Sequence, residues 1–186
     1  MKGGVQMNVL LIVILVLVII LIVPFITISN KFNRLIVKID EADSDIDVAL
    51  IKRHDTLTKM LDVVKGYAKH EKETLVEIIN VRKGMSSQEK TEAIKSLDES
   101  AQKINVLAES YPELKSSENY NTLQKSIADT EEHLQAARRM YNANVSAFNQ
   151  YLVSFPASVI GGMKGLSKKE FLEAEEEKKE DVKMDL

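Results

Sequence analysis

Three histidines are the side chains with which this sequence could bind a metal or move a proton near neutral pH: His54, His70 and His133. A di-iron site in a helical bundle needs paired Glu-x-x-His motifs. The residues three positions before the histidines are instead Ile51, Tyr67 and Thr130. We therefore interpret the histidines as solvated surface side chains, and we expect neither a metal site nor a bound cofactor.

Other catalytic patterns are also missing from the sequence. It has no cysteine, which excludes disulfides, thiolate zinc sites and thiol catalysis. It has no glycine-rich phosphate loop and no Gly-x-Ser-x-Gly motif, and its serines, histidines and aspartates follow no recognisable catalytic spacing. We therefore predict that the protein is not an enzyme.

The most specific polar pattern is an aromatic residue followed directly by asparagine. It occurs at Phe32-Asn33, Tyr120-Asn121, Tyr141-Asn142 and Phe148-Asn149. The last two pairs are seven residues apart, and Tyr120 precedes Tyr141 by three heptads, so these aromatic residues share one stripe of a helix.

This aromatic–asparagine pattern has two interpretations, and both stay open. In the first, the rings fill the core and the amides tie neighbouring helices at its edge. In the second, the tyrosine and asparagine side chains line a face that binds a small ligand or peptide. The candidate residues for either role are Asn33, Asn121, Tyr141, Asn142 and Asn149.

A second polar group lies earlier, at Asp45-Ile46-Asp47, Lys52-Arg53 and Asp55. Its spacing offers no ion pair within one helix between the first aspartates and the residues four positions later. We expect structural ion pairs across helices instead, with Arg138-Arg139 as partners.

The elements that position these residues are helices. Apolar residues recur in alternating steps of four and three, which is typical of bundle or coiled-coil packing. The first stripe is Leu35, Ile39, Ala42, Ile46, Ala49, Met60, Val64 and Tyr67. The second is Ile94, Leu97, Ala101, Ile104, Ala108 and Tyr111. The third is Tyr120, Leu123, Ile127, Thr130, Leu134, Ala137, Tyr141, Asn144, Phe148, Tyr151 and Phe155.

Helix boundaries are also readable. Lys83-Gly84 predicts the end of the first helical region, and Ser86 with Glu89 predicts a capping box for the second. Ser110 with Glu113 repeats that pattern around Pro112, which predicts the start of the third. Ser154-Phe155-Pro156 ends the last long helix, glycines 161, 162 and 165 predict a hinge, and the acidic, lysine-rich tail 173–185 predicts frayed or disordered chain.

The first stripe falters at Arg53, His54, Asp55 and Thr56. A kink there, or a turn between two antiparallel helices, would explain it. A turn gives four helices in an up-and-down bundle, whereas one unbroken helix would leave much of its apolar face unpaired. We predict an all-α, antiparallel bundle of four helices and leave the break point within 52–58 open.

Residues 9–28 predict a membrane anchor. Val9 to Val23 are fifteen consecutive apolar residues, and the next five extend the run to twenty. Twenty helical residues span ~30 Å, the thickness of a bilayer core. A cleaved signal peptide would have a shorter apolar run and small residues at its end, and here the run ends in Thr27-Ile28-Ser29.

The predicted organisation is a short segment at 1–8, a transmembrane helix at 9–28, a helical bundle domain at 29–160 and a flexible acidic tail at 161–186. Before Lys168 the chain has 20 basic and 20 acidic residues, which argues against nucleic acid as a partner. Lys31, Arg34 and Lys38 follow the apolar run and only Lys2 precedes it, so we expect the N-terminus outside and the bundle in the cytoplasm.

Six stretches of the sequence form a recognisable series: Phe32 to Ile36, Ser44 to Val48, Val64 to Glu71, Ala108 to Leu114, Ala137 to Asn142, and Phe155-Pro156. In type and order they resemble the LemA family of bacterial membrane proteins. The sequence departs from the family at Thr58, where the family pattern suggests proline. It also departs in the tail, which lacks the aromatic-rich ending of the family. The resemblance implies an anchored antiparallel helical domain and no established enzymatic activity.

These observations predict a scaffold or interaction protein at the cell membrane. Its expected partners are the lipid bilayer and other membrane or cytoplasmic proteins. The alternative is a binding module whose face of tyrosine and asparagine side chains holds a small ligand or peptide.

Overall fold

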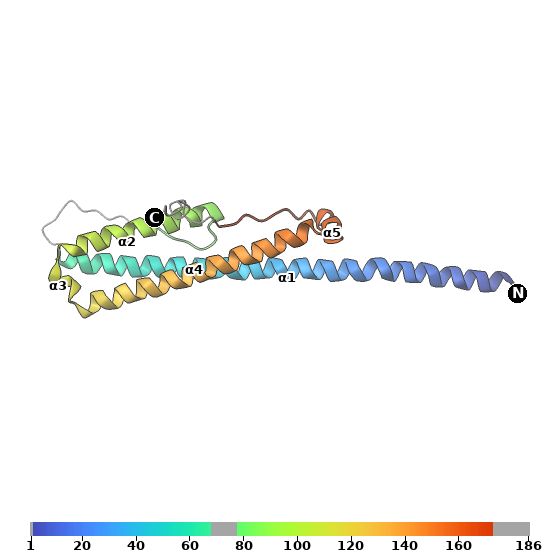
Figure 1. Cartoon of the computed structure of the whole chain (residues 1–186), viewed down its shortest axis with the longest axis horizontal. Helices are drawn as coiled ribbons and strands as arrows, with labels where there is room; N and C mark the ends of the chain where they lie inside the picture. The colour runs from blue at the N-terminus through green and yellow to red at the C-terminus, as the bar shows by residue number, and fades with distance from the viewer. Residues whose placement is uncertain (1, 68–77, 173–186) are drawn as a thin grey trace, which may run out of the picture. The chain divides into compact units, whose positions relative to one another are not determined.

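The computed structural model describes residues 2–67 and 78–172, with side chains described from Leu10 onward. These residues form helices and no strand, which confirms the all-α prediction. The helices are α1 (Lys2–Tyr67), α2 (Ser87–Glu109), α3 (Pro112–Lys115), α4 (Glu118–Val153) and α5 (Ala157–Met163), as Figure 1 shows.

The chain divides into two compact units. The N-terminal unit comprises Met1–Ile39 and Asn144–Lys169, and the bundle unit comprises Asp40–Ala143 and Glu170–Leu186. Helices α1 and α4 each contribute to both units, while α2 and α3 belong to the bundle unit and α5 to the N-terminal unit.

In the bundle unit, α1 and α2 run in the same direction. Lys90, near the start of α2, contacts Asp43, and Asp98, further along α2, contacts Arg53. Both residue numbers increase together, so the helices are parallel. This parallel pair differs from the predicted up-and-down order, in which consecutive helices alternate in direction.

Helix α4 runs opposite to α2. Tyr120, in the first turn of α4, donates to Asn105 near the end of α2. Further along α4, Glu131 pairs with the same arginine, Arg53, that holds Asp98 on α2. The described part of the bundle unit therefore has three long helical segments, from α1, α2 and α4, and the short helix α3 connects α2 to α4.

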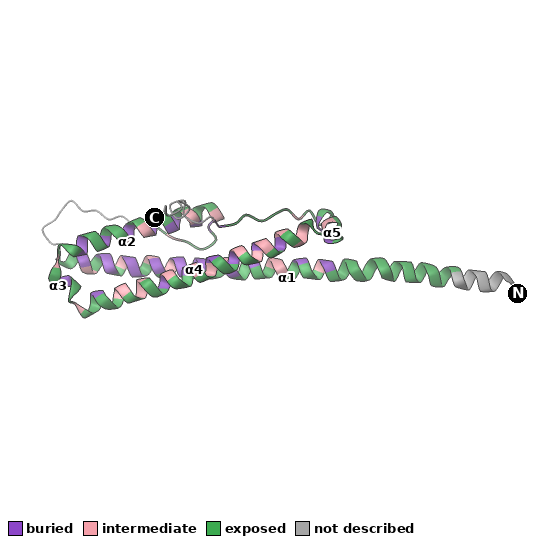
Figure 2. Cartoon of the chain, in the orientation of Figure 1, coloured by how far each residue is buried: buried purple, intermediate pink, exposed green. Residues whose placement is uncertain are grey.

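The predicted stripes supply part of the core of the bundle unit. Buried residues form a line along the part of each long helix that lies in this unit (Figure 2). The stripe residues with no exposed surface include Ile46, Leu97, Ile104 and Leu134. The stripes missed three residues that are equally buried: Leu50, Leu57 and Leu114. The outer ends of two stripes depart from the prediction, since Tyr67 is 45% exposed and Phe155 is 84% exposed.

The predicted break in the first stripe is absent, because α1 is helical through residues 52–58. Arg53 lies seven residues after the buried Ile46 and is itself buried, so the stripe continues with a charged residue in a core position. Thr56 and Thr58 donate their hydroxyls to the carbonyls of Lys52 and His54 within the helix. Internal hydrogen bonds and ion pairs therefore replace the expected turn.

The capping box at the start of α2 is confirmed. The Ser86 hydroxyl accepts from the Glu89 N–H, and the Glu89 carboxylate accepts from the Ser86 N–H at 2.7 Å. The second predicted box is wrong, since Ser110 instead forms the C-cap of α2 and Pro112 opens α3 without a side-chain cap. Helix α1 ends at Tyr67, well before the predicted end at Gly84, which lies in a turn with φ +72°.

The N-terminal unit is built around Phe32, which has no exposed surface. Its ring lies 5.9 Å from that of Phe148 and 4.9 Å from that of Tyr151, measured between centroids. Asn144 donates to the Lys38 carbonyl at 2.9 Å, which ties α4 to α1 within this unit. Aromatic packing therefore holds the two helices together here.

The predicted glycine hinge is wrong at Gly161 and Gly162, which lie inside α5. A Cβ at Gly161 would stand 2.6 Å from Leu152 and 3.2 Å from Phe32, so this position is a close helix contact. Gly165, at φ +65°, ends α5 in a Schellman motif, with Gly165 donating to Gly162 and Leu166 to Gly161. The motif turns the chain out of the helix into residues 166–172. The predicted tail 173–185 lies outside the described residues.

The start of α1 is apolar and long enough to cross a membrane. Its apolar window has a mean hydropathy of 3.6 and is 6% buried. Its side chains from Leu10 to Val23 are between 43% and 72% exposed, and none contacts a core in the described chain. A soluble core helix would be mostly buried, so this exposure fits a membrane span or a signal sequence.

Candidate peptide-binding face

Asn142 of α4 holds a backbone residue of the 166–172 segment by two hydrogen bonds. Within the bundle unit, its Nδ2 donates to the Leu172 carbonyl at 3.0 Å, and its Oδ1 accepts from the Leu172 N–H at 2.9 Å. Such an exchange of both bonds with one residue is the pattern of a hydrogen-bonded pair in an antiparallel sheet. The amide therefore acts as a neighbouring strand for Leu172.

Asn149 makes the same pair of bonds in the N-terminal unit. Its Nδ2 donates to the Lys169 carbonyl and its Oδ1 accepts from the Lys169 N–H, both at 2.8 Å. Each unit therefore contains one contact of this kind, between an α4 amide and one backbone residue.

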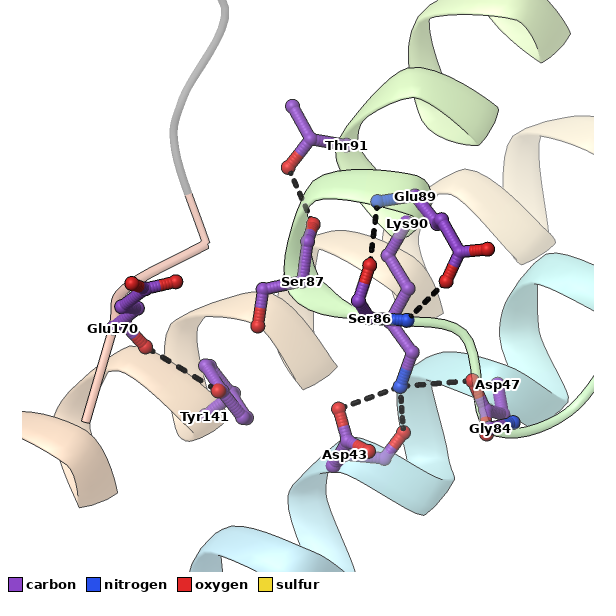
Figure 3. Close-up of polar contacts among 10 residues, drawn as sticks. All are labelled: Asp43, Asp47, Gly84, Ser86, Ser87, Glu89, Lys90, Thr91, Tyr141 and Glu170. Atoms are coloured by element: carbon purple, nitrogen blue, oxygen red, sulfur yellow. Dashed lines mark hydrogen bonds and ion pairs between the residues drawn. The ribbon is translucent and has the colours of Figure 1, made fainter.

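Two further contacts fix the segment in the bundle unit. The Tyr141 hydroxyl donates to the Glu170 carbonyl at 3.3 Å (Figure 3). The Leu172 side chain is 3% exposed, so it is buried while its backbone is bound. We call Tyr141 and Asn142, which hold this segment within the bundle unit, the amide face of α4. The amide face binds backbone groups, and the buried position of Leu172 accepts one apolar side chain.

The structure does not gather all five candidate residues. Asn33 is exposed on α1, where its Oδ1 accepts from Lys164 at 3.1 Å. Asn121 is exposed near the start of α4. The aromatic–asparagine pattern therefore included the residues of the amide face, but no sequence pattern indicated that the amide partner is a later segment of the same chain.

The sequence analysis missed a buried lysine. Lys90 of α2 has no exposed surface, and its Nζ lies 2.5 Å from Asp43 Oδ1 and 2.8 Å from Asp47 Oδ1 on α1 (Figure 3). Asp47 also accepts from the Gly84 N–H at 3.0 Å, which anchors the turn before α2. Lys90 precedes the core residue Leu97 by one heptad, and that position was the available signal.

Arg53 forms the second buried ionic group. It pairs with Asp98 of α2 and, at 2.9 Å, with Glu131 of α4. The predicted partners of the first aspartates were Arg138 and Arg139, whereas Asp47 pairs with Lys90. Within the described residues no cluster of histidine and acidic side chains has the geometry of a metal site. The two ion pairs of Arg53 connect α1 to α2 and to α4.

A sequence model of the LemA family matches residues 42–186, which is most of the chain. The chain belongs to the LemA family. The match covers the buried ion pairs, the amide face and the segment that the amide face holds.

A curated LemA relative gives a second comparison. The chain is 28% identical to "Protein LemA" of Metamycoplasma hominis over 123 residues, which are 63% of this chain and 56% of that protein. The chain thus spans about half the length of the curated relative that it matches. Both comparisons identify the LemA family, and neither names a biochemical role.

Proposed function

We propose that this LemA chain is a membrane-anchored interaction protein that binds an extended peptide on the amide face of α4. The observation that carries the proposal is the two-bond contact from Asn142 to the backbone of Leu172 within the bundle unit. Asn149 makes the same kind of contact with Lys169 within the N-terminal unit. Backbone bonds supply affinity for an extended peptide of any sequence, and side-chain pockets supply selectivity. The buried position of Leu172 makes a leucine-like side chain the selective element.

The chain's own segment occupies the amide face in the structure described here. A covalently attached segment has an effective concentration in the millimolar range, so it competes strongly with a peptide from solution. A partner would therefore bind well only when it offers more contacts than residues 169–172, or when the segment is displaced. The attached segment therefore sets a minimum affinity that a partner peptide must exceed in order to bind.

Peptide add-back tests the proposal. The chain truncated after Leu166, in detergent micelles, should bind a fluorescent peptide of residues 167–172, and the intact chain should bind it much more weakly. The truncated chain carrying both Asn142→Ala and Asn149→Ala is the matched control and should lose binding, with circular dichroism confirming its helices. Equal binding to the truncated chain and the control would refute the amide face as the binding surface.

The alternative of a small ligand on the same face has less support. A side-chain amide that exchanges two hydrogen bonds with one backbone residue fits a peptide better than a compact molecule. A lack of catalytic patterns in the sequence supports a binding role over an enzymatic one.

We propose that the apolar start of α1 anchors the domain in the cell membrane, with the N-terminus outside and the bundle unit in the cytoplasm. Lys31, Arg34 and Lys38 follow the apolar run, and Lys164 contacts Ser29 at its end, so basic side chains gather on one side. Basic residues near a span favour the cytoplasmic side.

A single cysteine tests this orientation, because the natural chain has none. Lys103→Cys, at an exposed position of α2, should resist a membrane-impermeant maleimide in intact cells and react after lysis. Labelling before lysis would place the bundle unit outside the cell.

A further inference from the structure

The end of the N-terminal unit carries exposed apolar side chains next to the apolar helix. Phe155 is 84% exposed, Met163 73%, Val153 61% and Val159 56%. They cluster at the end of α4, in the following turn and on α5. Large exposed apolar patches mark contact surfaces for a membrane or a partner.

Helix α5 is apolar on both sides. Ala157, Ile160 and Gly161 are buried, while Val159 and Met163, four residues apart on one face, are exposed. The sequence of α5 contains no charged residue. A helix that is apolar all round is normally buried, so the exposed face of α5 lacks a cover in the isolated chain.

The position of α5 along α1 fixes what lies beside that face. Gly161 packs at Phe32, and Lys164 donates to Ser29 at 2.7 Å and to Asn33 at 3.1 Å. The apolar run of α1 ends at Ile28, and Ser29 to Asn33 rise only ~6 Å beyond it. The headgroup layer on each side of a bilayer is ~5–8 Å thick. Helix α5 thus lies at headgroup depth when α1 spans the membrane.

The charges of the same unit fit an anionic surface. Residues 29–39 and 144–169 contain six basic residues and no acidic residue: Lys31, Arg34, Lys38, Lys164, Lys168 and Lys169. Basic side chains near the cytoplasmic leaflet are attracted by its negative lipids, by ~1 kcal/mol each. The Lys31 Nζ lies 4.1 Å from the centroid of the Tyr151 ring. Tyrosine is a residue type that favours the membrane interface.

We propose that the Phe155–Met163 corner is a second membrane contact, in which Phe155, Val159 and Met163 insert into the interface of an anionic bilayer. The inference rests on the anchoring role proposed for α1. An inserted corner together with a spanning helix gives two points of attachment, which restrains the tilt of α1 at the membrane surface.

Single tryptophan reporters test this contact, because the natural chain has no tryptophan. The full-length variants Phe155→Trp, Ile19→Trp and Val106→Trp are reconstituted in phosphatidylcholine–phosphatidylglycerol vesicles with brominated acyl chains. Val106 is 66% exposed on α2 and serves as the water-exposed control. Phe155→Trp should be quenched several-fold more than Val106→Trp and should emit at shorter wavelength. Quenching no stronger than that of Val106→Trp would overturn the proposal.

Ile19→Trp separates this inference from the anchor itself. Strong quenching of Ile19→Trp with weak quenching of Phe155→Trp refutes only the second contact, whereas weak quenching of both refutes the anchor as well. In the Phe155→Trp background, Lys168→Gln with Lys169→Gln should reduce quenching in anionic vesicles. The matched pair Lys103→Gln with Lys125→Gln should leave it unchanged, and an equal reduction by both pairs would refute the role of the local charges.

Discussion

The N-terminal unit and the bundle unit are stabilised by different chemistry. The N-terminal unit packs aromatic rings around Phe32 and brings α5 against α1 at Gly161, and it has no acidic residue. The bundle unit carries 18 basic and all 28 acidic residues, and it buries Lys90 and Arg53 in ion pairs. Helices α1 and α4 therefore each have one part in a unit without acidic residues and another part in a unit rich in acidic residues.

This difference shows how one helix can be stabilised by different interactions in its two parts. A buried ion pair can select which helices pack together in a water-soluble region. The same charges, when separated, are well solvated there. Near a bilayer, aromatic packing and close glycine contacts need no buried charge. The composition of each unit thus matches the environment that we propose for it.

The largest expected effect is in the bundle unit. Lys90→Met removes the only cation that the structure places beside Asp43 and Asp47 among the described residues, and it leaves two carboxylates facing an apolar side chain. Breaking a buried ion pair on one side costs about 3–5 kcal/mol. Urea unfolding in detergent micelles measures this loss, with the exposed Lys103→Met as control. A loss under about 1 kcal/mol, the value for surface pairs, would mean that the cluster is not a buried one.

In the N-terminal unit, Gly161→Ala should destabilise the contact of α5 with α1. The added methyl would overlap Leu152 and crowd Phe32, and overpacking typically costs about 1–3 kcal/mol. Gly162→Ala is the control, since nothing lies within 4 Å of its added Cβ. Equal unfolding midpoints for the two variants would contradict the close contact.

The amide face predicts a local effect. Asn142→Ala removes two bonds to Leu172 and should weaken the hold on the segment by about 1–3 kcal/mol. Amide hydrogen exchange at Leu172 should accelerate, while exchange in α2 stays unchanged. Asn121→Ala, from the same sequence pattern but exposed, should leave Leu172 protected. Unchanged protection in Asn142→Ala would show that the segment is held by other contacts.

The capping box predicts a small pH effect in the bundle unit. The backbone N–H and then the hydroxyl of Ser86 lower the pKa of Glu89 below its ordinary value. A lowered pKa in the folded state means that the stabilisation is present at neutral pH and is lost as the pH falls through that pKa. The first turn of α2 should therefore fray in acid. Glu89→Gln should remove this part of the pH dependence, as read from amide exchange at Lys90, and an identical profile would contradict it.

Much of the fold follows from the sequence, and the exceptions share a cause. Heptad stripes identified part of the core, and Ser86 with Glu89 identified the start of α2. Arg53 was interpreted as a break because a charged residue in a stripe resembles an interruption unless its partners are known. Those partners, Asp98 and Glu131, lie 45 and 78 positions away, beyond the reach of local patterns.

The amide face shows the same limit. The Asn142 and Asn149 spacing was visible in the sequence, but the segment 166–172 has no periodicity that would pair it with α4. Bonds to a backbone leave no trace in the sequence of the segment that is bound, so only the structure could reveal it.

The measurement that tests the central claim most directly is the intact mass of the protein that remains in cell membranes after an alkaline carbonate wash. The account predicts that the chain stays in the membrane pellet and retains residues 9–28, because the eighteen Leu, Ile, Val and Phe residues there favour insertion by roughly −0.3 to −0.6 kcal/mol each. A chain released by the wash, or one whose mass shows cleavage after the apolar run, would contradict the membrane anchor on which the rest depends.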